Sequence, residues 1–172
     1  NVDLTPPTVR AVLREPDHNG WFNRPVTVVF ICDDALSGIL SCTPPVTVGH
    51  GANMAAAGTA VDKASNWTTV SVQGLQIDTV PPIITAAPDR EPDANGWYNA
   101  PVTITFTCSD DLSGIASCPE PVTLTEGVNQ QVGGTAVDAA GNQSAFTLSG
   151  INVDLSVPTA SLQLLDVSPG RM

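Results

Sequence analysis

The stretch EPDANGWYNAPVTITFTCSDDLSGIASC, from Glu91 to Cys118, occurs twice in this chain. The earlier copy, EPDHNGWFNRPVTVVFICDDALSGILSC, runs from Glu15 to Cys42, at a constant shift of 76 residues. A fixed period of this size, with a cysteine pair in each copy, indicates one small domain used in tandem. The 172 residues are therefore expected to form two small domains rather than one large one.

Proline pairs mark the boundaries between the copies. Proline cannot donate to a sheet ladder, so Pro6-Pro7 and Pro81-Pro82 are expected to be stiff linkers. Residues 1–5 resemble residues 152–156, which predicts that the chain begins on the last strand of a preceding repeat. The predicted segments are the end of that repeat with its linker (1–6), domain 1 (7–79), domain 2 (80–156), and the first strand of a third repeat or a tail (157–172). This last segment is either cut short or completes the sandwich of a neighbouring molecule.

The clearest predicted strand follows the repeated Asn-Gly turn. Val102, Ile104 and Phe106 alternate with threonines, and this period of two places apolar groups on one face and hydroxyls on the other. Such a pattern is typical of a half-buried antiparallel strand. Six or seven short strands in each copy, with turn signals between them and no helical periodicity, predict an all-β fold with one Greek-key β-sandwich per copy.

Four cysteines occupy the same positions in the two copies. A domain of about 76 residues buries only about 60 to 65% of its unfolded surface and is marginally stable without a crosslink. The expected crosslinks are the disulfides Cys32–Cys42 and Cys108–Cys118, which persist in oxidising compartments. A zinc site is the alternative, but no histidine lies at ligand spacing from either pair. Within the first clamped loop, Leu36 and Ile39 are expected to close the end of the core.

The chain is strongly acidic, with 17 acidic residues against six basic residues and a formal net charge of −11. Such a surface repels phosphate backbones and anionic lipid, so no nucleic-acid partner is expected. No apolar run is long enough to span a bilayer, so the chain is not expected to be membrane-embedded. Together with the cysteines, these features predict an extracellular or cell-surface location.

The shared motifs resemble the bacterial immunoglobulin-like repeats that occur in tandem on surface and secreted proteins. The resemblance lies in GWYNAPVT (96–103), DDLSGIASC (110–118), GTAVDAAGN (134–142) and GINVDLSVP (150–158). The first copy departs from the pattern at Ser65, where the second copy has a glycine, and the local cysteine pair replaces the usual bridge between distant strands. The resemblance implies two immunoglobulin-like sandwiches that act as a structural spacer or stalk of a surface protein or filament. The implied partners are neighbouring repeats of the same chain, with self-assembly into a filament.

Catalysis is not expected, because it needs an activated nucleophile or an acid–base pair in a concave site. His18 and His50 align with Ala94 and Glu126, so neither histidine belongs to the repeated plan. The serines of the Leu-Ser-Gly-Ile loops have no histidine partner and suit a turn role. We therefore predict no catalytic residues and no enzyme activity.

Aspartates recur at one end of each predicted sandwich, where the clamped loop and the turn after Asp138 face the preceding domain. The sets expected to converge are Asp78, Asp110, Asp111 and Asp138 between the domains, and Asp3, Asp33, Asp34 and Asp62 before the first. Clustered carboxylates are the ligands that Ca²⁺ prefers, so calcium is the one cofactor that the sequence suggests. The alternative is that these aspartates cap turns and keep the protein soluble.

Two aromatic pairs, Trp21-Phe22 and Trp97-Tyr98, permit a second hypothesis. Exposed aromatics stack on sugars, which would make the chain a carbohydrate-binding or adhesive accessory module of a secreted enzyme, with a glycan or surface ligand as partner. Burial of these aromatics in the ends of the sandwiches is the more common arrangement.

The last turn of each copy ends in a glycosylation sequon. Asn66-Trp67-Thr68 and Asn142-Gln143-Ser144 lie at equivalent positions, which predicts glycosylation of Asn66 and Asn142. Their recurrence is also explained by one shared asparagine that ends the turn.

Overall fold

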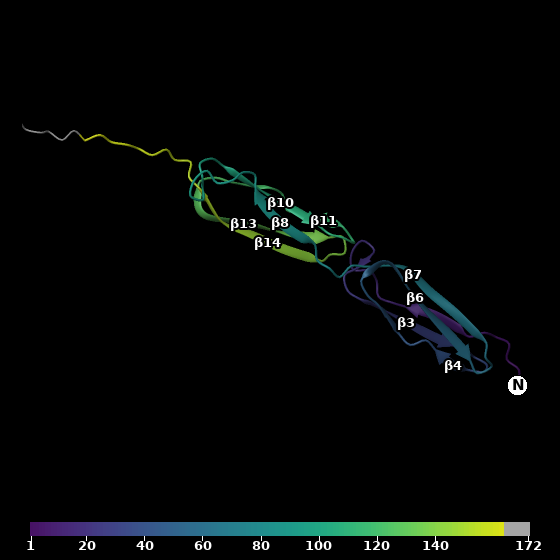
Figure 1. The fold of residues 1–172 in the computed structure, drawn as a ribbon. Coiled ribbons are helices and arrows are strands. Elements are labelled where there is room, and N and C mark those ends of the chain that lie inside the picture. Colours follow the sequence, from purple (N-terminus) through teal and green to yellow (C-terminus); the bar gives the residue numbers. More distant parts are fainter. Residues whose placement is uncertain (164–172) are drawn as a thin grey trace, which may run out of the picture.

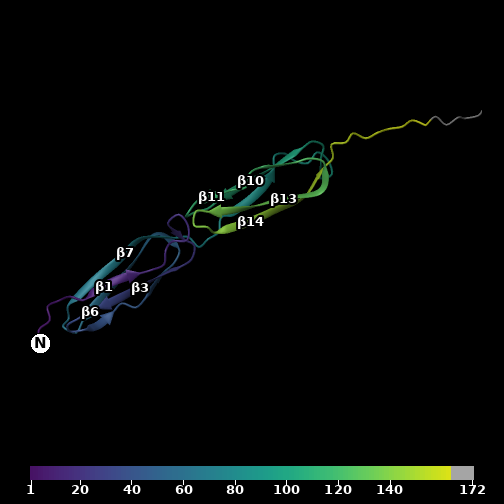
Figure 2. The ribbon, with the colours of Figure 1, turned by 180° about the vertical axis from the view of Figure 1, so that it is seen from behind.

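The computed structural model describes residues 1–163, which form two strand-rich units joined end to end (Figure 1). The view from behind shows the same elongated arrangement, with the N-terminus at one end and residues 154–163 extending from the other (Figure 2). The described residues contain no helix, and hence none that could cross a membrane.

Each unit consists of seven strands. Unit 1 contains β1 (Thr8–Val12), β2 (Trp21–Phe22), β3 (Val26–Asp33), β4 (Ile39–Cys42), β5 (Val46–Val48), β6 (Gly51–Asp62) and β7 (Trp67–Ile77). Unit 2 contains β8 (Ile83–Pro88), β9 (Trp97–Tyr98), β10 (Val102–Ser109), β11 (Ile115–Ser117), β12 (Val122–Leu124), β13 (Gly127–Asp138) and β14 (Gln143–Val153).

A three-stranded and a four-stranded sheet build each sandwich. The sheet orders are β1-β3-β5 and β2-β7-β6-β4 in unit 1, and β8-β10-β12 and β9-β14-β13-β11 in unit 2. Paired strands are antiparallel except β2 with β7 and β9 with β14, which are parallel. In unit 1 the chain alternates between the two sheets from β1 to β6, and β6 and β7 are neighbours in the four-stranded sheet; unit 2 repeats this order. The predicted all-β fold of two tandem sandwiches is confirmed.

The core of unit 1 shows why the alternating pattern becomes β3. Val26 and Val28 are fully buried and Phe30 is 6% exposed, while the residues between them face solvent. Burying each such side chain stabilises the fold by about 1.5 to 3 kcal/mol. Gly58 on β6 leaves room for the Phe30 ring, since a Cβ at Gly58 would lie 2.7 Å from Cε1 of that ring. The small residues of β6 therefore allow the two sheets to approach closely.

Both expected disulfides are present. Cys32 on β3 and Cys42 on β4 are joined with their Cα atoms 6.0 Å apart, so the bond ties one sheet to the other. Cys108 and Cys118 repeat the bond in unit 2, at 5.9 Å. Structural disulfides of this kind are typical of oxidising, extracellular environments.

The expectation for Leu36 was wrong, because its side chain is 68% exposed. Asp34 accepts the N–H groups of Leu36 and Gly38, at 3.2 and 2.7 Å. These bonds fold the clamped loop around the carboxylate, and Leu36 faces solvent instead of closing the core.

The strands fall within the predicted domain boundaries, since β7 ends at Ile77 and β8 begins at Ile83. Residues 157–163, expected to begin a further strand or a tail, form no strand. The remainder of that predicted segment, 164–172, lies outside the described residues.

Candidate functional site

Three aspartates that are distant in sequence meet at the junction between the units. Asp78 comes from the linker after β7, Asp110 from the loop after β10, and Asp138 from the end of β13. One carboxylate oxygen of each lies within 4.8 Å of the others. Asp78 and Asp138 are 0% and 1% exposed. We call Asp78, Asp110 and Asp138 the junction cluster.

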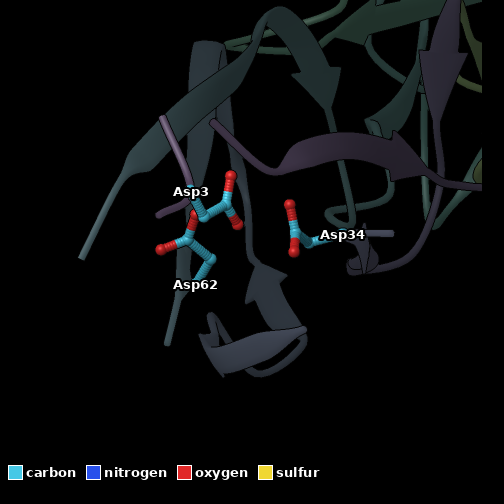
Figure 3. Close-up of side chains that lie close together, drawn as sticks. All are labelled: Asp3, Asp34 and Asp62. Carbon is cyan, nitrogen blue, oxygen red and sulfur yellow. The ribbon is translucent and has the colours of Figure 1, made fainter. Parts of the chain in front are cut away.

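An equivalent group lies at the far end of unit 1. Asp3, Asp34 and Asp62 also bring one carboxylate oxygen each within 4.8 Å of the others, and we call them the upstream cluster. Figure 3 shows the Asp3 carboxylate between those of Asp34 and Asp62, each carried by a separate segment. The same arrangement is therefore built at the same end of both sandwiches.

The fourth expected member of each set lies outside its cluster. Asp111 and Asp33 are exposed, and neither belongs to the groups of converging carboxylates. Asp33 is the last residue of β3, whose alternation turns it away from the core. In the second loop it is Asp110 that turns inward to accept the hydrogen bonds of the loop. Three members of each expected set of four therefore converge, and calcium binding by the expected residues stays a prediction.

Hydrogen bonds from the loops and turns already occupy several of these oxygens. Asp110 Oδ1 accepts the N–H of Leu112 at 3.2 Å, the hydroxyl of Ser113 at 3.4 Å and the N–H of Gly114 at 2.8 Å. Asp138 Oδ1 accepts the N–H of Asn142 at 2.8 Å. Buried carboxylates need such partners, and in return they fix the conformation of the turns around them.

Asn142 connects the junction cluster to the linker. Its side-chain amide donates to Asp138 Oδ2 at 2.8 Å and to the main-chain carbonyls of Asp78 and Val80 at 2.9 and 3.4 Å. Asn66 makes the same three bonds in unit 1, to Asp62 and to the carbonyls of Asp3 and Thr5. This asparagine therefore holds the incoming linker against the end of its own unit.

The hydrogen bonds of Asp78 stabilise its charged form. Burial alone would raise its pKa, but hydrogen bonds from Ser113 and Val80, together with nearby His50, outweigh burial and hold the pKa of Asp78 below its usual value. Asp78 Oδ2 accepts the N–H of Ser113 at 3.0 Å, and Oδ1 accepts the N–H of Val80 at 3.0 Å. His50 Nδ1 lies 3.5 Å from Asp78 Oδ1 and accepts the N–H of Thr79 at 3.2 Å.

Each cluster has the residue types that could hold a cation. Three converging carboxylates are fewer ligands than the six to eight oxygens that Ca²⁺ takes, so water would have to complete the coordination. The carbonyls of Asp78 and Val80 already accept from Asn142. Burial of these aspartates is thus explained by hydrogen bonds alone, and calcium at Asp78, Asp110 and Asp138 stays a prediction.

A small cavity lies beside the junction cluster. It has a volume of about 140 Å³ and is lined by His50 from unit 1 and by Asp78, Asp110, Asp111 and Leu112, among others. His18, the other histidine of unit 1, lies against the turn at Gly141 across the junction. The two histidines outside the repeated plan both come from unit 1 and both lie where it meets unit 2.

The aromatic pairs are divided between the core and the surface. Phe22 and Tyr98 are buried, each 3% exposed. Trp97 is 38% exposed and lines a depression of about 260 Å³, together with Asp93, Asn99 and Asp154, among others. Core burial therefore holds for the second member of each pair, and Trp97 lies at the surface.

An arginine beside each aromatic pair was not expected from the sequence. Arg14 lies over the Phe22 ring, 4.7 Å from its centroid, and Arg90 lies over the Tyr98 ring at 5.3 Å. Asp17 pairs with Arg14, and Asp93 pairs with Arg90. These arginine–aspartate ion pairs could have been predicted from the repeated Arg-Glu-Pro-Asp sequence, which places an arginine three residues before an aspartate in both copies.

The predicted glycosylation sites coincide with the asparagines that hold the linkers. The Nδ2 atoms of Asn66 and Asn142, where a glycan would be attached, donate the hydrogen bonds described above. Attachment would cost at least one of these bonds. The bonds explain why asparagine recurs at these positions, and glycosylation stays a prediction.

No family model matches this sequence, and comparison with curated proteins and with solved structures gave no significant match. The class of protein therefore rests on the chain itself: tandem β-sandwiches, each with one internal disulfide and with an aspartate cluster at one end. The resemblance to bacterial immunoglobulin-like repeats stays a hypothesis based on the motifs.

Proposed function

We propose that this chain is a structural spacer, a pair of stiff immunoglobulin-like modules of an extracellular surface protein or filament. In this proposal the chain has no catalytic role. Its mechanism is geometric: each junction sets the angle between neighbouring sandwiches, so length grows with the number of modules.

The observation that carries the proposal is that Asp78 is bonded to both units. Its main-chain N–H donates to the carbonyl of Phe22 in unit 1 at 2.9 Å. Its side chain accepts the N–H of Ser113 in unit 2 at 3.0 Å. A residue held from both sides restricts rotation about the linker, whereas a flexible linker would leave its backbone solvated.

Two further features support a structural extracellular role. Each disulfide joins the two sheets of its sandwich, which resists their separation. Pro81 and Pro82 fix two φ angles in the linker, after Asp78, Thr79 and Val80. Disulfides and proline linkers both favour a fold that persists outside the cell.

Small-angle X-ray scattering tests the proposal directly. We expect one elongated particle whose scattering fits the end-to-end arrangement of the units. A variant with Val80-Pro81 replaced by Gly-Ser provides the matched control, since its linker is loosened and its bent forms should be visible. Wild-type scattering that matches this loosened control would contradict the spacer function.

A carbohydrate-binding or adhesive role is the second candidate, and the exposure of Trp97 favours it. The indole ring stands beside Asn99 and Asp93, which offer hydrogen-bonding groups for sugar hydroxyls. Screening on a glycan array would test this role, with Trp97→Ala as the loss variant. Trp67, which is 66% exposed in unit 1, supplies the matched control as Trp67→Ala. Binding that survives Trp97→Ala, or no binding at all, would remove this candidate.

A further inference from the structure

The end of unit 1 that faces unit 2 is formed by a tight turn. Trp21 N–H donates to the carbonyl of His18 at 2.6 Å, and Asn19 and Gly20 take positive φ values of 47° and 83°. The turn projects His18 and Asn19 toward unit 2. The side-chain amide of Asn19 lies 3.5 Å from the carbonyl of Ala139.

The facing turn of unit 2 receives the His18 ring at Gly141. A Cβ at Gly141 would lie 2.6 Å from Nε2 and 2.9 Å from Cγ of His18, closer than real Cβ contacts. Because Cγ is the ring atom attached to the His18 Cβ, turning the ring about χ2 would not clear the overlap. A side chain at 141 therefore requires the exposed His18 side chain to change its χ1 rotamer, or the junction to open.

The turn itself does not demand glycine. Gly141 has φ +88°, and its N–H donates to the carbonyl of Asp138 at 3.2 Å. Ser65 occupies the same place in unit 1 with φ +71°, and its N–H donates to Asp62 at the same distance. The same turn thus carries a side chain in unit 1 and lacks one in unit 2, where the His18 ring lies against it.

At the other end of unit 2, an alanine replaces the histidine. Its turn repeats the bonds of the His18 turn, with Trp97 N–H donating to the carbonyl of Ala94 at 2.8 Å. Ala94 therefore stands where unit 1 has His18. A small residue there leaves space for a side chain such as that of Ser65 on the facing turn of another module.

We infer that positions 18 and 141 form a size-matched pair that determines which module fits after which. The histidine end of unit 1 takes a following module with glycine at the turn. The alanine end of unit 2 takes a module of the unit 1 type, with serine at the turn. A histidine end facing a serine turn is disfavoured, because the histidine must give up the position that His18 holds against Gly141. This inference rests on the proposed spacer function and adds a rule for the order of modules.

The test uses the full chain with four variants: His18→Ala, Gly141→Ser, the double variant, and Ser65→Gly. The readout is ¹⁵N relaxation, which gives a rotational correlation time for each unit. In the wild type we expect both units to tumble as one body. Gly141→Ser should uncouple them, so that the correlation time of each unit falls toward that of a separate module.

The double variant separates the steric match from strain in the turn. Serine at positive φ strains unit 2 whether or not His18 is present, so His18→Ala cannot relieve that strain. We expect the double variant to restore joint tumbling, and His18→Ala and Ser65→Gly to keep it. Coupled tumbling in Gly141→Ser, meaning that His18 simply rotates away, would overturn the inference, as would a double variant that stays uncoupled. Uncoupled units in the wild type would overturn the stiff spacer as well.

Discussion

The side-chain amide of Asn142 donates to the main-chain carbonyl of Asp78, 64 residues earlier, at 2.9 Å. Asn66 makes the matching bond to Asp3 at 3.2 Å. One asparagine per unit thus fastens the segment that enters the unit to the turn between its last two long strands. The fixed conformation of the linker is therefore coupled to the stability of the unit that follows it.

Replacing Asn142 with alanine should destabilise unit 2. The change removes donors to Asp138, which is 1% exposed, and to two linker carbonyls. Loss of hydrogen bonds to buried partners costs about 1 to 3 kcal/mol in the free energy of unfolding. Urea unfolding measures the effect, with Gln143→Ala, at the exposed neighbouring position, as the control. An Asn142→Ala variant as stable as this control would contradict the role of Asn142.

Removing the disulfide of unit 2 should destabilise that unit and leave unit 1 unchanged. The bond between Cys108 and Cys118 closes a loop with a sequence separation of 10. For a loop this short, the lost constraint is worth about 2 to 3 kcal/mol. The Cys108→Ala/Cys118→Ala double variant, followed by calorimetry, should therefore split the melting profile into two transitions. A profile identical to that of the wild type would show that the bond contributes little.

The stabilising contribution of Asp78 should be lost in acid, so the free energy of unfolding should fall as pH is lowered. Its pKa in the folded state is lowered, so its contribution to stability is complete above the usual aspartate pKa of about 3.9 and is lost as pH falls through the lower folded value. Asp78→Asn should be less stable than the wild type at pH 7, because an amide cannot accept at both of its terminal atoms. The difference should shrink as pH falls from about 5 toward 2. Unfolding curves that differ by the same amount at every pH would contradict this account.

Calcium is predicted to bind the two clusters weakly. Extracellular modules bind Ca²⁺ with Kd values of about 10⁻⁴ to 10⁻³ M, so 10 mM Ca²⁺ should stabilise a site by about 1.4 to 2.7 kcal/mol. The Tm should rise with Ca²⁺, and EDTA should reverse the rise. Asp110→Asn should abolish the gain of unit 2, while Asp111→Asn, outside the cluster, should retain it. If Ca²⁺ leaves the Tm unchanged, the aspartates act only as hydrogen-bond acceptors.

Local patterns in the sequence were sufficient to predict the strands, the disulfides and the convergence of most of the aspartates. Val102, Ile104 and Phe106 alternate over a single strand, so their burial follows from the backbone geometry alone. Asp78 and Asp138 could be placed together because a linker and a turn must meet where one sandwich ends and the next begins.

The remaining features depend on contacts between distant segments. The sequon at Asn142 predicts a glycosylation acceptor, and nothing in the local sequence indicates a bond to a residue 64 positions away. Leu36 was expected in the core because it is apolar, but the bonds to Asp34 decide the path of its loop. Arg90 could have been found, since its Arg-Glu-Pro-Asp sequence repeats in both copies.

Residual dipolar couplings measured separately for residues 7–79 and 80–156 of the intact chain test the stiff junction most directly. If Asp78 is held by both units as described, the two sets of couplings should fit one alignment tensor, with the units oriented end to end. Two tensors of clearly different magnitude would mean that the units reorient independently, and would contradict the account of this chain as a rigid spacer.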